Sequence, residues 1–295
     1  MFSMSPNSSP ASKPFNTEEY SSLATLFFNQ GRATEAEDLY KQALELARLS
    51  NGSGDAAHTN KLEELGWFYW QQDKFQEAEP LFERVLALRS REASPNDELL
   101  IRSLQQLATT YDKTGKPRKA EELLRRLLAK QEEHFGPNAL ELVPTLNHLA
   151  DCGIVQGDYA LAEKLYLRLL AIEEFYYGTY SVEINATVQA LINVFERQGK
   201  IVLAEFMFQK QEAILAQIHG TEALCVAACL LRRAEMLTKA GRKEQAEPIY
   251  QKVLNIYQKA YGLDSGPVNS LARKLLQLYP LSLESHPESN GATDQ

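Results

Sequence analysis

Apolar residues near the start of the chain recur at the spacing of an α-helix. One stripe, with intervals of three, four and seven residues, consists of Tyr20, Leu23, Ala24 and Phe27. Asn16 precedes this stripe and Glu19 follows three places later, which is the capping-box pattern of a helix start. Gly31 follows the stripe, where a left-handed C-cap is expected. A second stripe of the same period consists of Ala36, Leu39, Tyr40, Ala43 and Leu44. The two stripes predict a helical hairpin.

This pattern returns every 42 residues. The turn position is occupied by Gly31, Asp73, Gly115, Gly157, Gly199 and Gly241. Two neighbouring columns are unbroken: alanine at Ala36, Ala78, Ala120, Ala162, Ala204 and Ala246, and glutamate at Glu37, Glu79, Glu121, Glu163, Glu205 and Glu247. We interpret the alanines as close packing and the glutamates as favourable charge near a helix N-terminus. A fixed period of roughly 20 to 50 residues indicates an array whose units pack against their neighbours.

The period predicts one all-α domain, a solenoid of six helical hairpins with a capping helix. The hairpins cover about residues 16–57, 58–99, 100–141, 142–183, 184–225 and 226–266, and the cap covers 267–280. Residues 1–15 and 281–295 are polar and lack periodicity, so we expect disordered tails. Pro117 should be the first residue of its helix, and Pro80 and Pro248 should lie within a first turn.

The second repeat, residues 58–99, identifies the type of array. Its pattern of a leucine pair, a small residue, an aromatic, then alanine and an aromatic reads Leu62, Leu65, Gly66, Tyr69, Ala78 and Phe82. This spacing resembles the tetratricopeptide repeat, and the 42-residue period resembles the variant found in kinesin light chains. The resemblance covers about residues 16–280 and implies a right-handed α-solenoid whose A helices, the first of each hairpin, line a concave, peptide-binding face. HEAT-type hairpins match less well, because they do not explain the alanine and glutamate columns.

The composition of the chain limits the classes of partner that we expect. The net charge of −8 and the isoelectric point near 5.3 argue against a general nucleic-acid surface. No apolar run approaches the roughly 18 to 20 residues that span a bilayer, and the N-terminus does not resemble a secretory signal. The three cysteines fit a reducing compartment. We expect a cytoplasmic protein with neither nucleic-acid nor membrane partners, and the sequence leaves its oligomeric state open.

The sequence gives little support for catalysis. The five histidines form no metal-binding motif, and no phosphate-binding or dinucleotide-binding loop is present. His148 and Cys152 lie four residues apart, and we interpret them as a partly exposed histidine and a buried thiol. We assign Cys225 and Cys229 to the core, and His219, in a column with Phe135, Tyr177 and Tyr261, to packing a helix end. We predict no catalytic residue, metal ligand or cofactor, and no enzyme activity.

The resemblance assigns the groove to polar and aromatic positions of the A helices. These are Glu63, Trp67, Trp70, Gln105, Thr109, Asp112, Asn147, Asp151, Gln189, Asn193, Glu196 and Glu235. The amides suit a peptide backbone, and tryptophan is enriched at binding hot spots. The acids either favour a basic partner or are a solvated face. Trp70 either binds or packs between the first two repeats.

Two functions are consistent with this pattern. The first is a non-catalytic scaffold that binds a peptide or protein partner in its concave groove. The second is a self-assembling element that stacks through its ends, at the first helix or near Leu281. Repeats 5 and 6 place Gln211, Glu212 and Arg233 at apolar positions of the pattern, which indicates either a second contact surface or a softer joint.

Overall fold

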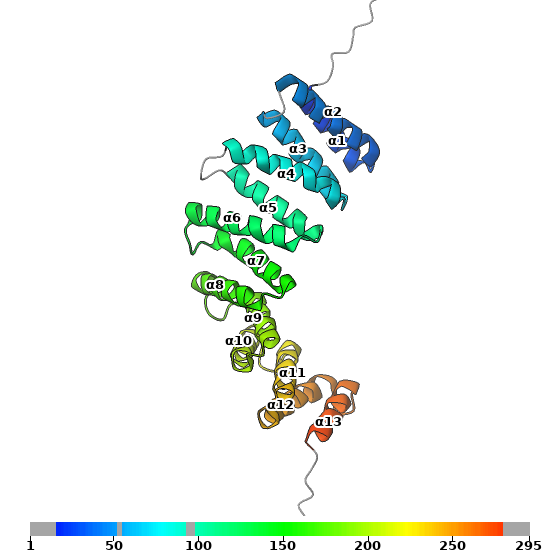
Figure 1. The fold of residues 1–295 in the computed structure, drawn as a ribbon. Coiled ribbons are helices and arrows are strands. Elements are labelled where there is room, and N and C mark those ends of the chain that lie inside the picture. The colour runs from blue at the N-terminus through cyan, green and yellow to red at the C-terminus, as the bar shows by residue number, and fades with distance from the viewer. Residues whose placement is uncertain (1–15, 52–54, 93–97, 280–295) are drawn as a thin grey trace, which may run out of the picture. The chain divides into compact units, whose positions relative to one another are not determined.

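The computed structural model describes residues 16–51, 55–92 and 98–279, and these form α-helices and one short 3-10 helix, with no strand among them. The predicted all-α repeat solenoid is confirmed (Figure 1). The predicted tails, including Leu281, lie outside the described residues. Within the described ranges, no helix has both the length and the apolar character needed to cross a membrane.

The chain divides into two compact units, residues 1–157 and residues 158–295. In each unit, every helix packs against the next along the chain. Unit 1 contains α1 (Thr17–Asn29), α2 (Ala33–Asn51), α3 (Ala56–Gln71), α4 (Phe75–Glu92), α5 (Glu98–Lys113), α6 (Pro117–Phe135), the 3-10 helix η1 (Leu140–Leu142) and α7 (Val143–Gln156). Unit 2 contains α8 (Tyr159–Tyr177), α9 (Asn185–Gln198), α10 (Ile201–His219), α11 (Leu224–Lys239), α12 (Lys243–Tyr261) and α13 (Gly266–Leu278).

The predicted helix ends are confirmed at both ends of the first helix. Asn16 and Glu19 form the capping box of α1, each side chain bonding the backbone N–H of the other. Gly31 follows the helix with a φ of +78°, a left-handed conformation in which glycine has no steric penalty. Asp73 occupies the same position of the second hairpin with a φ of +57°, so one turn of the array adopts this conformation without glycine.

Small residues allow the two helices of a hairpin to approach closely. All six residues of the alanine column, from Ala36 to Ala246, have no solvent exposure. Gly66 on α3 faces the ring of Phe82 on α4, and a methyl group added at Gly66 would lie 2.5 Å from the Phe82 Cε1 atom. This distance is far below van der Waals contact, so the second hairpin requires glycine here.

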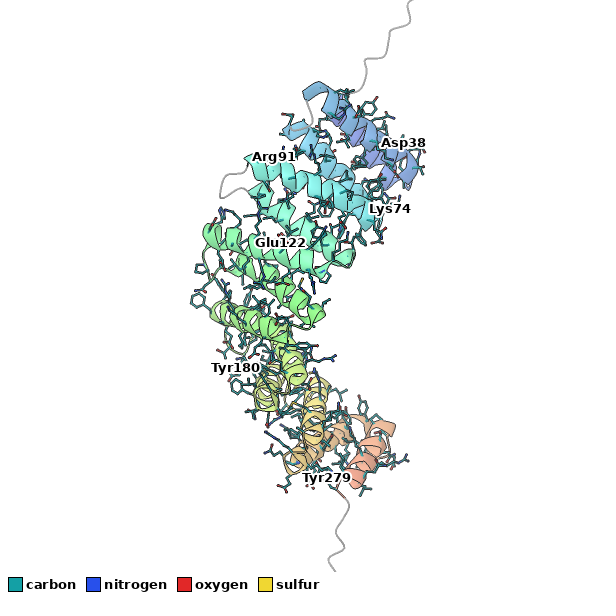
Figure 2. The ribbon with its side chains drawn as sticks, viewed as in Figure 1. Asp38, Lys74, Arg91, Glu122, Tyr180 and Tyr279 are labelled. Atoms are coloured by element: carbon teal, nitrogen blue, oxygen red, sulfur yellow. The ribbon has the colours of Figure 1, made fainter. Side chains whose placement is uncertain are left out.

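The glutamate column connects successive repeats, a role that differs from the predicted interaction with a helix N-terminus. In unit 1, Glu37 pairs with Lys74, labelled in Figure 2, at 3.8 Å, and Glu79 pairs with Lys116 at 2.6 Å. In unit 2, the equivalent ion pairs are Glu163 with Lys200 at 2.5 Å and Glu205 with Arg242 at 3.9 Å. Each pair joins a B helix, the second of its hairpin, to the turn of the next hairpin, and we call the four the inter-repeat ion pairs.

Two proline assignments and one aromatic assignment are wrong. Pro80 and Pro248 lie inside α4 and α12, each at the sixth helical residue and therefore in the second turn, where proline removes one backbone hydrogen bond. Pro117 does begin α6 as predicted. The column of His219 does not pack a helix end, because its members are the last residues of their B helices and are exposed to solvent. These are Phe135, Tyr177, His219 and Tyr261.

Candidate functional site

The twelve predicted groove residues all lie on the A helices. Eight belong to unit 1, on α3, α5 and α7, and four belong to unit 2, on α9 and α11. Each unit therefore has its own set of candidate contacts. The contacts of each side chain show which of the twelve residues are available to a ligand and which already bond to other residues of the chain.

A hollow with a volume of about 310 Å³ lies between α3 and α5 of unit 1. We call it the tryptophan hollow, and its lining residues are Trp67, Trp70, Arg102, Gln105, Gln106 and Thr109. Four of these were predicted from the sequence, whereas Arg102 and Gln106 were missed. The hollow combines two indole rings with one cation and several polar groups, which is typical of ligand sites.

The two tryptophans support each other as a rigid apolar surface. Their rings meet edge to face, with centroids 5.4 Å apart. Trp70 also packs on Phe75 at 5.6 Å, and Trp67 on Phe82 at 6.0 Å. Trp67 keeps 38% of its surface exposed. Among the described residues, the ring partners of Trp70 are Trp67 and Phe75, and both belong to the second repeat.

Glu63 is connected to the tryptophan hollow through a hydrogen bond with Gln106. It accepts hydrogen bonds from the Arg89 guanidinium at 2.6 and 3.1 Å, in an ion pair that is largely buried. With its amide oriented to satisfy both neighbours, Gln106 donates to Glu63 at 3.2 Å and accepts from the Trp67 indole N–H at 2.9 Å. Arg89, Glu63 and Gln106 thus fix the Trp67 ring, so Glu63 orients the hollow and does not present a free charge.

The other predicted acids also have partners within the chain. Asp112 contacts the His148 ring, Glu196 pairs with Arg232 at 2.6 Å, and Glu235 pairs with Lys274. Asp151 accepts a hydrogen bond from Asn147 at 3.2 Å. The carboxylates of the predicted row are therefore largely compensated by the protein's own side chains.

In unit 2, the predicted amides belong to a local polar network. Gln189 accepts from the Gln211 amide at 2.9 Å, and Asn193 accepts from Arg232 at 2.6 Å. Gln211 is buried, and its oxygen is 3.5 Å from the Cys229 thiol. The polar replacements in repeats 5 and 6 thus find partners inside unit 2.

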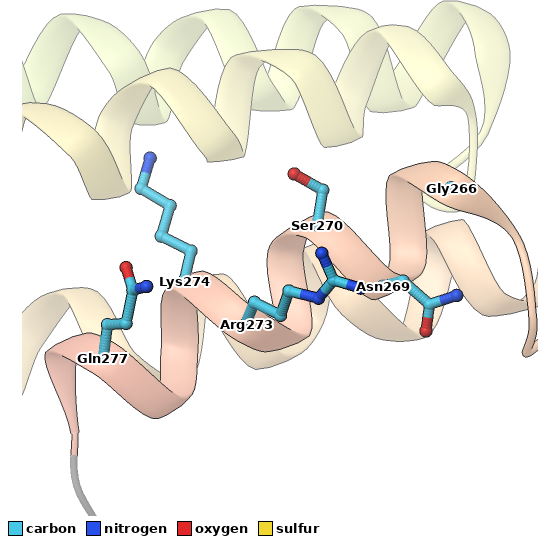
Figure 3. Close-up of a pocket in the computed structure, with 6 residues that line it drawn as sticks. All are labelled: Gly266, Asn269, Ser270, Arg273, Lys274 and Gln277. Atoms are coloured by element: carbon cyan, nitrogen blue, oxygen red, sulfur yellow. The ribbon is translucent and has the colours of Figure 1, made fainter.

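A second hollow lies along α13, and its volume is about 500 Å³. It was not predicted as a site, and its lining residues are Gly266, Asn269, Ser270, Arg273, Lys274 and Gln277. Figure 3 shows Lys274 extending from α13 toward a neighbouring helix, and its ammonium pairs with Glu235 of α11. Because exposed polar groups of one helix line this hollow, we regard it as the solvent-facing side of the capping helix.

Two of the three thiols have lowered reactivity. Burial, followed by the negative charge of Asp112, raises the pKa of Cys152 to about 12. Burial, followed by the charge of Glu212, raises the pKa of Cys229 to about 12. Thiols with such pKa values form little of the nucleophilic thiolate at neutral pH. Both side chains are buried, as the sequence predicted.

Family models for the tetratricopeptide repeat match residues 20–58, 58–133, 106–175 and 183–259. No curated protein matches the chain. Among solved structures, the chain is similar to the nearly identical TPR-like repeats of a kinesin light chain protein from Podosopora anserina. Identity is 21% over 68% of this chain and 96% of the other, with a TM-score of 0.58.

Two further structures share the fold. BtubC (BKLC) from P. vanneervenii is 19% identical over 86% of this chain and 96% of its own, with a TM-score of 0.53. The apo form of RapI is 14% identical over 89% of this chain and 74% of its own, with a TM-score of 0.56. At these identities the similarity establishes the fold alone. The family models, in contrast, match most of the helical sequence, and the chain therefore belongs to the tetratricopeptide repeat family.

Proposed function

We propose that unit 1 binds an extended peptide segment of a partner protein at the tryptophan hollow. The tetratricopeptide fold supports a protein-interaction scaffold with protein or peptide partners, and the family is generally non-catalytic. The observation on which our proposal rests is the tryptophan hollow itself. It combines a half-exposed Trp67, a supporting ring and hydrogen-bonding groups in one place.

The chemistry of the hollow defines the ligand. An apolar or aromatic side chain packs on Trp67, where burial of aromatic area supplies most of the binding energy. The exposed amide of Gln105 and the acceptor oxygen of Thr109 are suited to the backbone of an extended peptide. Arg102, also exposed, adds a positive charge at the edge of the hollow. This charge favours an acidic residue beside the apolar anchor.

The predicted preference for a basic partner rests on the carboxylates of the A helices. Glu63, Glu196 and Glu235 already pair with cationic side chains of the protein. The preference stays a prediction, and it opposes the preference that Arg102 creates. The affinities of two peptides with the same aromatic anchor, one flanked by lysines and the other by glutamates, distinguish the preference for a basic partner from the preference for an acidic one.

The experiment is a selection from a displayed peptide library against the wild-type chain alone, followed by affinity measurements on wild type and Trp67→Ala. We expect the selected peptides to share an aromatic or large apolar residue and to lose at least about tenfold in affinity to Trp67→Ala, because a hot-spot side chain contributes roughly 2 kcal/mol. Phe175→Ala, at an exposed aromatic of unit 2, is the matched control and should leave affinity unchanged. Peptides that bind Trp67→Ala as well as wild type would refute the proposal.

Asn147 defines the extent of the groove. It is exposed on α7 in the same unit, and its amide already bonds Asp151. If the peptide continues from the tryptophan hollow to α7, Asn147→Ala weakens binding and the Trp67→Ala/Asn147→Ala variant is the weakest of the series. An unchanged affinity for Asn147→Ala limits the site to α3 and α5.

Self-assembly through the terminal helices is the alternative. Leu26 on α1 and Leu276 on α13 are 51% and 59% exposed, which leaves apolar surface on the first and last helices. Assembly through these surfaces would survive Trp67→Ala and be lost in Leu276→Glu. Light scattering of the wild type and both variants over a range of concentrations decides between the two functions, and a monomer at all concentrations rules out the alternative.

A further inference from the structure

Three different metal-ligand side chains meet between α5 and α7 of unit 1. Asp112 lies near the end of α5, and His148 and Cys152 lie one turn apart on α7. The Asp112 carboxylate contacts the His148 ring through Oδ2, and its Oδ1 atom is 3.7 Å from the Cys152 sulfur. One ligand atom of each residue lies within 4.8 Å of the others. A carboxylate oxygen, an imidazole nitrogen and a thiol sulfur therefore converge on one point.

Other repeats of the chain have different residues at the positions equivalent to Asp112, His148 and Cys152. One junction earlier in the same unit, the equivalent residues are Trp70, Gln106 and Thr110. At the first junction they are Phe28, Glu64 and Phe68, whose two aromatic rings pack at 5.4 Å. Between α9 and α11 they are Glu196, Arg232 and Met236, where an ordinary ion pair forms. Aromatic packing or a simple ion pair is thus sufficient to join neighbouring A helices, and the repeat does not require three ligands here.

The charge around these residues favours a cation. Asp112 is itself one of the three residues, and the carboxylates of Glu121 and Asp151 lie close enough to the Cys152 sulfur to act on it electrostatically. A divalent cation compensates this negative charge and stabilises a bound thiolate and carboxylate together.

The spacing of the ligand atoms suits zinc. Bonds of roughly 2.0 to 2.3 Å in a tetrahedral site separate ligand atoms by about 3.3 to 3.8 Å, so the observed convergence requires only small side-chain movements. Nitrogen and sulfur donors select Zn²⁺ over magnesium or calcium, which prefer oxygen ligands. Asp112 and His148 are 30% and 23% exposed, so the point of convergence is accessible from solvent.

We propose that Asp112, His148 and Cys152 bind one Zn²⁺ ion per chain, with a fourth position open to water or to a side chain of a bound partner. On binding, the Cys152 sulfur releases its proton to solvent and forms the metal bond. The ion fastens α5 of the third repeat to α7 of the fourth. The proposal departs from the sequence-based prediction that the chain contains no metal ligand, and it does not depend on peptide binding at the tryptophan hollow.

The test uses the full-length protein, treated with chelator under reducing conditions and titrated with Co²⁺ and then Zn²⁺. We expect one Co²⁺ per chain, a thiolate-to-cobalt charge-transfer band in the near ultraviolet, and displacement by one equivalent of Zn²⁺. Cys152→Ser should abolish the band. We expect Zn²⁺ binding to weaken at least about 100-fold in each of the variants Cys152→Ser, His148→Gln and Asp112→Asn. Mutating a residue that only hydrogen-bonds a metal ligand weakens binding roughly 10- to 100-fold, and removing the ligand itself should have a larger effect.

Two variants are matched controls. Cys229→Ser removes a thiol of similar burial on α11, and Asp151→Asn removes a neighbouring acid outside the ligand set. Cys229→Ser should keep the band at wild-type strength, and Asp151→Asn should keep the stoichiometry of one ion. Circular dichroism checks the fold of each variant. If a ligand variant unfolds, the wild type still decides, because bound Zn²⁺ must raise its melting temperature and slow alkylation of Cys152. A wild type that takes up no metal at micromolar concentration, or a folded Cys152→Ser variant that retains the band, overturns the proposal.

Discussion

The interiors of the two units differ at equivalent positions of one repeat. In unit 1, Leu65, Leu107 and Leu149 occupy a core column and are almost completely buried. In unit 2, the same column contains the fully buried Leu191 and then Arg233, whose side chain is 14% exposed and pairs with Glu205 at 2.9 Å and Glu212 at 3.4 Å. At these three positions unit 1 uses apolar packing, whereas unit 2 uses apolar packing at Leu191 and a compensated charge at Arg233.

The comparison separates what the repeat requires from what it tolerates. Both units keep the fully buried alanine column and the inter-repeat ion pairs. The leucine column can change when its neighbours change with it, as Glu212 does where an earlier repeat has Leu170. Function can therefore vary between units without altering the hairpins that support it.

The largest effect should come from placing the arginine of unit 2 into unit 1. Leu107→Arg introduces a charge into a site where the position equivalent to Glu212 is Leu86 and the equivalent of Glu205, Glu79, already pairs with Lys116. We expect a loss of about 3 to 5 kcal/mol in the free energy of unfolding, measured by urea denaturation. Leu107→Met is the control and should cost less than about 1.5 kcal/mol. An arginine tolerated as well as methionine would show that the two interiors are interchangeable.

A somewhat smaller effect is expected at the closest approach within a hairpin of unit 1. The methyl group of Gly66→Ala would clash with the buried Phe82 ring, and we expect a loss of about 1 to 3 kcal/mol in the free energy of unfolding. Thermal and urea denaturation measure it. In the double variant Gly66→Ala/Phe82→Leu the two losses should be less than additive, because the smaller side chain relieves the clash. Strict additivity would indicate that the two residues do not interact.

Removing the positive charge of Arg233 from unit 2 should lower the free energy of unfolding by a smaller amount. Arg233→Leu restores the leucine of the other repeats but leaves Glu205 and Glu212 without their shared cation, although Lys252 still pairs with Glu212 at 2.6 Å. We expect a loss of about 1 to 2 kcal/mol in the free energy of unfolding. Arg233→Leu/Glu212→Leu should recover the wild-type value, since well-packed apolar residues replace buried ion pairs without loss. A double variant less stable than the single one would contradict this reasoning.

The smallest effect concerns an inter-repeat ion pair and depends on pH. The hydrogen bond from Lys200 lowers the pKa of Glu163 below its usual value of 4.5. A lowered folded-state pKa stabilises the protein above pH 4.5, and that stabilisation is lost as the pH falls through the folded-state value. Lys200→Met should therefore cost about 0.5 to 1 kcal/mol near pH 7 and nothing once Glu163 is protonated. Urea denaturation at several pH values measures the difference, and a cost that is independent of pH would exclude the ion pair as its cause.

The sequence predicted the fold because the fold depends on short-range periodicity. The alanine column, the capping box at Asn16 and the close contact at Gly66 all follow from the chain alone. The site was predicted only in part, because it depends on which residues of neighbouring A helices face each other. Trp70 and Gln106, Asp112 and His148, and Glu196 and Arg232 are all separated by 36 residues. A search of the sequence at this separation would have paired Asp112 with His148.

Peptide binding at the tryptophan hollow can be followed directly through the fluorescence of the two tryptophans that line it. The chain has only two, Trp67 and Trp70, and both line this hollow, so the intrinsic tryptophan fluorescence of the protein reports on one place. Titration with a peptide selected as described above should shift the emission to shorter wavelength and saturate with the same dissociation constant as calorimetry. A peptide that binds by calorimetry without changing the tryptophan emission would contradict the proposal and locate binding elsewhere on the solenoid.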